Sequence, residues 1–187
     1  MFTVPYVHFK KSSDHETHKQ ELLLRFRSCS KETLRTREFD DVTTDWFYCR
    51  ENNVRAEYFC YVRDALSERL HRVKELFDDS DLEITDMWFQ QSQDQQRHSA
   101  HTHGAVGLSC IWYLEFDAEV HKATKFYAPY TNPLDGGTLE FVPDIEEGDL
   151  FVFPSYLLHE QIPSFAPKRR TIISFNILKR QVWPDQT

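Results

Sequence analysis

The chain has 187 residues, of which 40% are hydrophobic, and its formal net charge is −8 at pH 7. This length and apolar content predict one domain, residues 1–187, with its own core. The acidic balance lacks the basic face with which duplex-binding proteins neutralise phosphates, and no run of about 18 apolar residues is present to span a membrane. We therefore expect neither a nucleic-acid nor a membrane partner.

The N-terminus and the four cysteines bear on the cellular compartment. Met1 to Pro5 is followed at once by the polar residues His8, Lys10 and Lys11, so the apolar core of a secretory signal is missing. The cysteines show no CxxC spacing, which argues against a zinc knuckle or a disulfide framework. We expect reduced cysteines and a cytoplasmic location.

The first part of the chain, residues 1–81, is predicted to be a largely helical support. The segment Ser13 to Glu16 has the spacing of a capping box and is followed by the apolar residues Leu22 to Leu24 and Phe26. A second, longer helix is predicted from about Asn53 to Phe77, where apolar residues recur at steps of three and four.

From Leu82 onward the pattern changes to short β-rich runs separated by turn residues. The runs are 82–90, 107–116, 138–142, 149–153 and 171–178. Several short strands at this spacing predict a mainly β sandwich or jelly roll with flanking helices, and residues 82–180 would form its catalytic core. The stretch Asp117 to Pro133 is predicted to be a long loop of the lid or binding type.

Three of the nine histidines lie close together between residues 98 and 103. Residues two apart in an extended chain point to the same side, so His101 and His103 can offer both imidazoles to one metal ion. His159, which follows the apolar run 150–153 and a Pro-Ser turn, is the candidate for a distant third ligand. A His-x-His sequence alone is as often a surface cluster as a metal site.

The other histidines are assigned less chemistry. His98 is a further contender, either as a ligand or as a donor that orients another histidine. A structural or solvent-exposed role is expected for the remaining five, which are His8, His15, His18, His71 and His121.

An arginine lies at the start of the last β-rich run. Alternation places Arg170 on the same face as Ile172, Ser174 and Asn176. An inward arginine beside a serine is costly without an anion, and a bound dicarboxylate would supply one through a bidentate contact. The alternative is an Arg170 that faces solvent or pairs with Glu140 or Glu160.

The run 107–116 gives a similar argument for a tyrosine. Tyr113 shares a face with Gly107, Ser109 and Ile111, whereas the other face, from Leu108 to Phe116 in steps of two, is core. Its hydroxyl could donate to the same carboxylate as Arg170, although a buried tyrosine is more often a packing residue.

Taken in order, these residues resemble the core of the 2-oxoglutarate/iron(II) dioxygenases. The closest resemblance is to a branch that includes phage-encoded oxygenases, and the prolyl hydroxylases are more distantly similar. The resemblance covers about residues 87–178 and rests on His101-Thr102-His103, Ser109 to Leu114, Gly136 to Phe141, Gly148 to Ser155, His159, and Arg170 to Asn176.

The resemblance implies a fold, cofactors and an activity. The fold is a double-stranded β-helix, with iron(II) bound by His101, His103 and His159. The far carboxylate of 2-oxoglutarate is bound by Arg170 and Tyr113, with Ser174 beside them. The implied enzyme is a hydroxylase that releases succinate and CO2, with ascorbate as a candidate reductant. A phage origin would place it in the host cytoplasm, and the substrate, a protein side chain or a small molecule, is not specified.

One residue departs from the usual pattern of two histidines and a carboxylate. His103 stands where Asp or Glu is expected, and three histidines are also a zinc set. A second register, with His103-Gly104-Ala105 as the motif, would resemble the halogenases. A zinc hydrolase-like site, with Glu140 or Glu160 as general base, and a jelly roll without catalytic activity are the alternative functions.

Overall fold

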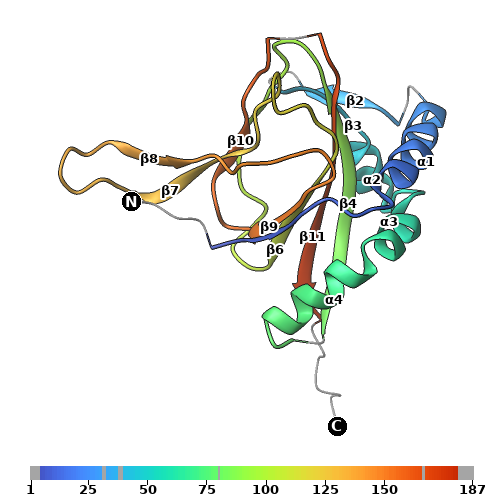
Figure 1. Ribbon diagram of the computed structural model, residues 1–187, viewed down its shortest axis with the longest axis horizontal. Coiled ribbons are helices and arrows are strands. Elements are labelled where there is room, and N and C mark those ends of the chain that lie inside the picture. The colour runs from blue at the N-terminus through green and yellow to red at the C-terminus, as the bar shows by residue number, and fades with distance from the viewer. Residues whose placement is uncertain (1–4, 31–32, 38–39, 80, 166, 181–187) are drawn as a thin grey trace.

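The computed structural model describes residues 5–30, 33–37, 40–79, 81–165 and 167–180. Within these ranges two antiparallel sheets face each other, and helices cover the outer face of the larger one (Figure 1). The helices are α1 (His15–Ser28), α2 (Trp46–Asn52), α3 (Phe59–Ala65) and α4 (Ser67–Leu76). The strands are β1 (Val7–Phe9), β2 (Arg35–Arg37), β3 (Asp40–Thr44), β4 (Leu82–Ser92), β5 (His98–His101), β6 (Leu108–Glu115), β7 (Lys125–Thr131), β8 (Thr138–Phe141), β9 (Leu150–Pro154), β10 (His159–Gln161) and β11 (Arg170–Lys179).

The larger sheet has the strand order β1-β9-β6-β11-β4-β3-β2, and the smaller sheet has the order β5-β10-β7-β8. Strands that are distant in sequence are neighbours in both sheets, as expected for a double-stranded β-helix. The predicted fold class, a mainly β jelly roll with flanking helices, is confirmed. No helix among the described residues is long and apolar enough to cross a membrane.

The central strands of the larger sheet are buried on both faces. In β6, Cys110 and Trp112 belong to the core beneath the helices, whereas Ile111 and Tyr113 belong to a second core between the sheets. The alternation predicted for this strand is therefore confirmed as far as Leu114. Phe116, predicted on the helix side, lies in the inner core because β6 ends at Glu115 and its alternation does not continue.

Strand β11 shows the same division. Ile173 and Phe175 pack beneath the helices, and Ile172 faces the space between the sheets. Arg170 and Ser174 are buried and lie on the inner side with Ile172. The predicted faces of this strand are correct, and they bring two candidate site residues into the interior of the jelly roll.

Helices form in both regions where they were predicted, but their bounds differ from the prediction. Helix α1 starts at His15, within the predicted capping segment, although Asp14 makes no side-chain capping bond. The single helix predicted from Asn53 to Phe77 is wrong, because α2 ends with Asn53 in the left-handed conformation at φ 52° and α3 begins only at Phe59. A further break at Leu66 separates α3 from α4.

Several strands were not predicted. Residues 117–133, expected to be a loop, contain β7, which pairs with β8 and β10. The first part of the chain also supplies β1, β2 and β3 to the larger sheet. Strand β1 is fixed to β9 by the buried Asp149, whose carboxylate lies 2.8 Å from Nε2 of His8 and accepts the backbone N–H of Lys11 at 3.0 Å. The two predicted parts, a helical support (1–81) and a catalytic core (82–180), both contribute strands to the larger sheet. The division between them stays a prediction.

A buried carboxylate joins the helical layer to β4 and makes stability depend on pH. Asp45 accepts hydrogen bonds from the Tyr58 hydroxyl at 2.8 Å and the Phe89 backbone N–H at 3.0 Å. Burial raises its pKa from 3.8 to about 6. The folded state thus holds this proton more tightly than the unfolded chain, so the stabilisation is full below pH 4 and is lost as pH rises through about 6.

We expect Asp45→Asn to flatten this part of the stability profile. In the wild type the free energy of unfolding, measured by urea denaturation, should fall between pH 4 and pH 7. In Asp45→Asn this fall should be smaller by about 2–3 kcal/mol, because the amide has no charge to desolvate. The matched variant Asp144→Asn, at an exposed position, should leave the profile unchanged. An unaltered pH dependence in Asp45→Asn would contradict the assignment.

Candidate active site

The three predicted metal-binding histidines come together at one end of the jelly roll. His101 is the last residue of β5, His159 is the first of β10, and the two are direct partners in the smaller sheet. His103 lies two residues beyond β5, where its backbone N–H donates to the Ser155 carbonyl at 2.9 Å. One potential ligand atom from each of the three residues lies within 4.8 Å of the others.

Hydrogen bonds on the far side of each ring determine which nitrogen faces the cluster. Nδ1 of His101 lies 2.7 Å from the Ser99 carbonyl, and Nδ1 of His159 lies 2.8 Å from the Leu157 carbonyl. A carbonyl oxygen can only accept, so Nδ1 carries the proton in both rings. The Nε2 atoms of His101 and His159 therefore present lone pairs, which is the arrangement that a metal ion requires.

His103 is oriented in the same way by side chains. Its Nδ1 lies 2.8 Å from Oδ1 of Asn176 and 3.0 Å from Oγ of Ser109. The Ser109 hydroxyl also contacts Oγ of Ser155 at 2.9 Å and donates to Asn176 at 3.0 Å. The sequence placed Asn176 on the inner face of its strand but assigned no role to it, and such a role could not be read from alternation alone.

The donor set fits a first-row divalent cation. Nε2 of His101 and Nε2 of His103 are only 3.1 Å apart, so two lone pairs would face each other without a cation between them. Burial lowers the pKa of His103 to about 4 and that of His159 well below its usual value. The imidazoles of His103 and His159 are therefore neutral at pH 7, which is the form that binds iron or zinc.

Arg170 is buried in the same part of the interior and is only partly satisfied. Its Nη1 donates to Oε1 of Gln161 at 2.5 Å, but Nε and Nη2 find no hydrogen-bond partner in the part of the chain that the structure describes. Burial lowers the pKa of the guanidinium from its usual value, although an arginine stays charged at pH 7. A buried cation without an anion costs several kcal/mol, so the site calls for an anionic ligand.

The alternative interpretation of Arg170 is wrong. The side chain does not face solvent, since the residue is 3% exposed. Neither proposed carboxylate partner contacts it: Glu140 and Glu160 both lie next to Nζ of Lys125, at 3.4 and 2.9 Å. The adjacent Arg169, by contrast, is satisfied by two hydrogen bonds of 2.8 Å to Glu115.

Tyr113 is next to Arg170, but its hydroxyl points elsewhere. The guanidinium carbon of Arg170 lies 5.4 Å from the centre of the Tyr113 ring, a cation–π distance. The hydroxyl donates to Oγ1 of Thr124 at 3.0 Å and accepts the Thr124 backbone N–H at 3.2 Å. A hydrogen bond from Tyr113 to a bound carboxylate therefore stays a prediction.

A small cavity joins the three histidines to Arg170. Its volume is about 20 Å³, and Ile111, Thr124, Ile172 and Ser174 also line it. This is room for about one water molecule, so a dicarboxylate needs side chains of the lining to move. Gln161 now occupies the position next to the guanidinium. A groove of about 500 Å³ reaches His101 and His103 from the outside of the protein.

The remaining histidines have structural contacts. Nδ1 of His121 accepts the Asp117 backbone N–H at 2.9 Å, and Nε2 donates to the Lys168 carbonyl at 3.0 Å. His98 lies beside the metal candidates, with its ring centre 4.1 Å from that of His101, and its Nδ1 is 3.1 Å from the Gln90 amide nitrogen. It lines the cavity but is outside the group of three converging ligand atoms.

Comparison with known proteins agrees with this geometry. Residues 86–176 match the family model described as "Putative 2OG-Fe(II) oxygenase". The matched segment contains every histidine of the cluster and Arg170. No curated protein matches the sequence.

Solved structures of similar fold extend over nearly the whole chain. A prolyl-4-hydroxylase from Pseudomonas putida has a TM-score of 0.66 at 16% identity, covering 96% of this chain and 95% of that chain. A Trichoplax adhaerens prolyl hydroxylase, solved with a peptide fragment of hypoxia inducible factor, has a TM-score of 0.62 at 14% identity, with 95% and 84% covered. The epimerase SnoN, solved with Fe3+ and alpha ketoglutarate, has a TM-score of 0.67 at 13% identity, with 94% and 79% covered.

The matched segment and the fold point to the same class of protein. Residues 86–176 match the 2OG-Fe(II) oxygenase family model, in agreement with the sequence resemblance, and the chain shares its fold with solved 2OG-Fe(II) oxygenases. The cofactors of the 2OG-Fe(II) oxygenases are iron(II) and 2-oxoglutarate, and the residues at this site fit both: three converging imidazoles for the metal and a buried cation for a carboxylate.

The hydrogen bond from His103 to Asn176 can be tested by metal binding alone. Asn176→Leu removes the acceptor that fixes the ring, and we expect a loss of about 10- to 100-fold in affinity for Zn2+ or Co2+. The affinity would be measured by competition with a chromogenic chelator. Asn176→Asp keeps an acceptor at this position and should bind at least as tightly as the wild type. Equal affinities in the leucine and aspartate variants would contradict this role of Asn176.

Proposed function

We propose that the protein is an iron(II)- and 2-oxoglutarate-dependent hydroxylase. His101, His103 and His159 bind the iron, and Arg170 binds the distal carboxylate of 2-oxoglutarate. One observation carries the proposal: a cavity with three converging imidazoles at one side has a buried arginine with two unpartnered donors at the other. A co-substrate that binds a metal and carries a second carboxylate satisfies both sides at once.

The cofactors supply the oxidative chemistry: oxygen is consumed, 2-oxoglutarate is converted to succinate and CO2, and a substrate C–H bond is hydroxylated. The protein provides position and shielding. Trp88 and Ile172, which are buried and line the cavity, keep water from the reacting centre. Ser174, buried on the same strand as Arg170, lies where it can contact the bound co-substrate.

The unusual third ligand determines the charge of the centre. Because His103 is neutral where a carboxylate is usual, the protein contributes no negative charge to the metal. The bound co-substrate would then provide the anionic ligands. Asn176 and Ser109 hold His103 with its Nε2 toward the metal position, so the protein orients this ligand as firmly as the other two.

The hydrolase alternative is less well supported. A zinc hydrolase needs a general base within hydrogen-bond reach of the metal-bound water. Glu140 and Glu160 do not line the cavity, and both are engaged with Lys125 on the outer side of the smaller sheet. A hydrolase also has no use for a buried arginine opposite the metal. The structurally similar proteins include both hydroxylases and an epimerase, so hydroxylation is the reaction we propose rather than one fixed by the fold.

The role of Arg170 is tested by the affinity for 2-oxoglutarate. Arg170→Ala should weaken binding by about 2–5 kcal/mol, because a carboxylate would be left buried without its partner. The affinity would be measured anaerobically from the visible absorption of the iron(II)–2-oxoglutarate complex. Arg169→Ala removes the same charge one position earlier, from a side chain bound to Glu115, and should bind normally. Unchanged affinity in Arg170→Ala would refute the assignment.

The reaction class is tested by succinate formation. Iron-loaded protein, incubated with 2-oxoglutarate, oxygen and ascorbate, should release succinate slowly even without a substrate. The rate should fall to background in His159→Ala, because a ligand of the metal is lost. If succinate never exceeds the metal-free control and zinc co-purifies in place of iron, a hydrolase-like site or an inactive jelly roll is the better interpretation.

A further inference from the structure

A groove of about 440 Å³ lies between α2 and β4, outside the cavity of the candidate active site. One wall consists of α2 and the chain that follows it, including Arg50 and Arg55. The other wall consists of four consecutive residues of β4, Thr85 to Trp88. Met87 packs beneath the helices and Trp88 lines the inner cavity, so a groove that touches both residues runs along the edge of the strand.

That edge of β4 is open for most of its length. Strand β11 pairs with β4 on one side from Leu82 to Ser92. On the other side β3 pairs only with Gln90 and Gln91 (Figure 1). Among the described residues no strand covers this side of residues 82–89. The Phe89 N–H is already bound to Asp45, so the edge that remains for an added strand runs from residue 82 to residue 88.

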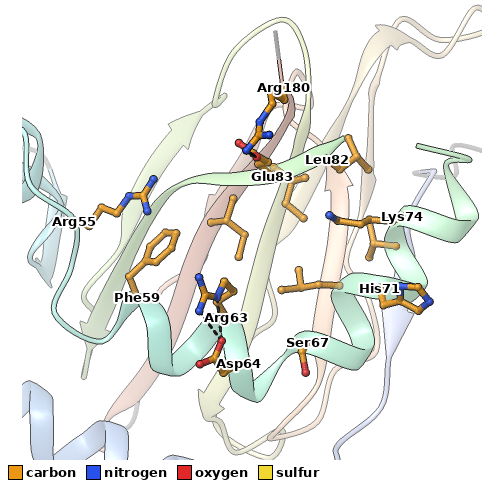
Figure 2. Close-up of a pocket in the computed structure, with 14 residues that line it drawn as sticks. Arg55, Phe59, Arg63, Asp64, Ser67, His71, Lys74, Leu82, Glu83 and Arg180 are labelled. Carbon is orange, nitrogen blue, oxygen red and sulfur yellow. Dashed lines mark hydrogen bonds and ion pairs between the residues drawn. The ribbon is translucent and has the colours of Figure 1, made fainter. Parts of the chain in front are cut away.

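The open edge leads to the metal candidates. The groove along β4 shares four lining residues, Trp46, Arg50, Asp86 and Trp88, with the groove that ends at His101 and His103. Its other end shares Arg55 and Phe59 with a third hollow of about 520 Å³ beneath α3 and α4 (Figure 2). The three hollows form one continuous path along β4, which suits an extended chain better than a compact small molecule.

The charges along this path favour an acidic occupant, although the whole chain is acidic. The guanidinium of Arg50 lies 5.0 Å from the Trp46 ring centre, and that of Arg55 lies 4.7 Å from the Phe59 ring centre. Among the described residues neither guanidinium forms an ion pair with a carboxylate. Farther along the path, Arg63 is already paired with Asp64. Arg50 and Arg55 are thus two cations, held by aromatic rings, that a partner's carboxylates can reach.

We propose that an extended acidic peptide binds along the edge of β4 as an added strand and delivers one residue to the metal beside His103. Backbone hydrogen bonds to β4 supply affinity without dependence on sequence, and Arg50 and Arg55 select acidic side chains. Trp88 lines both the peptide groove and the metal cavity, so it separates the bound backbone from the reacting centre. This inference rests on the proposed function, because it names the substrate class of the same site.

Binding is tested without turnover, using the iron-free wild-type chain. The probe is a fluorescein-labelled decapeptide that alternates glutamate and valine, and binding is followed by fluorescence anisotropy. It should bind at least tenfold more tightly than a decapeptide that alternates lysine and valine. Arg50→Gln and Arg55→Gln should each weaken binding by about three- to fivefold, as expected for exposed ion pairs. Arg72→Gln, an equal change of charge at an exposed position of α4, should have no effect.

Strand addition is distinguished from side-chain contact by N-methylation of the probe. In a strand, alternate residues turn their N–H groups to the same edge. Methylation of either all the glutamate or all the valine nitrogens should therefore weaken binding by about tenfold or more, and methylation of the other set should weaken it far less. In the complex, hydrogen exchange should slow for the backbone amides of residues 82–88.

Three outcomes would overturn the inference: no binding of the glutamate peptide, equal effects of both methylated sets, or tighter binding of an oligothymidylate of matched charge. The last result would assign the path to a single-stranded nucleic acid, which also uses aromatic and cationic side chains. Because none of these measurements needs iron or 2-oxoglutarate, failure here is distinct from failure of the hydroxylase proposal. Succinate formation without peptide binding would leave the enzyme class intact and remove only this substrate class.

Discussion

The site depends on one backbone pairing, that of β5 with β10. This short antiparallel ladder places His159 directly opposite His101, although the two residues are far apart in sequence. The register shifts between His159 and Gln161, and such an irregularity changes the direction of the side chains that follow it. Gln161 then reaches Arg170 on the opposite sheet. The same few residues therefore position two of the candidate metal ligands and occupy the place beside the arginine.

The second constraint is the burial of a charge that the protein does not neutralise. The two cations that precede Arg170 in the sequence each pair with a carboxylate. Arg169 pairs with Glu115, and Lys168 pairs with Asp117. Arg170 is instead enclosed by Tyr113 and the inner core, with only a neutral amide as its partner. Such an arrangement destabilises the protein without a ligand, and an anion that binds only the folded state offsets that cost. The destabilising burial of this charge lies where the proposed function places an anionic co-substrate.

The sequence predicted those parts of the fold that have a local signal. Alternation assigned the faces of β6 and β11, and with them the interior position of Tyr113, Arg170 and Ser174. Strands β1 and β7 were missed because they are defined by distant partners, such as Asp149 for β1, and because Pro129 interrupts the β-rich pattern of β7. Residue type could not show where a side chain hydrogen-bonds. The Tyr113 hydroxyl was expected beside Arg170 and is instead bound to Thr124, and the contact of Asn176 with His103 had no signal at all.

The helical prediction failed at the segment that joins α2 to α3. The predicted continuous helix from Asn53 to Phe77 is not formed. Asn53 instead adopts the left-handed conformation that ends α2, and the chain turns before α3 begins. The buried Tyr58 fixes that turn through Asp45, which also binds the backbone of Phe89 in β4. One carboxylate thus links the chain around α2 to β4, and local helix propensity yields there to a tertiary contact.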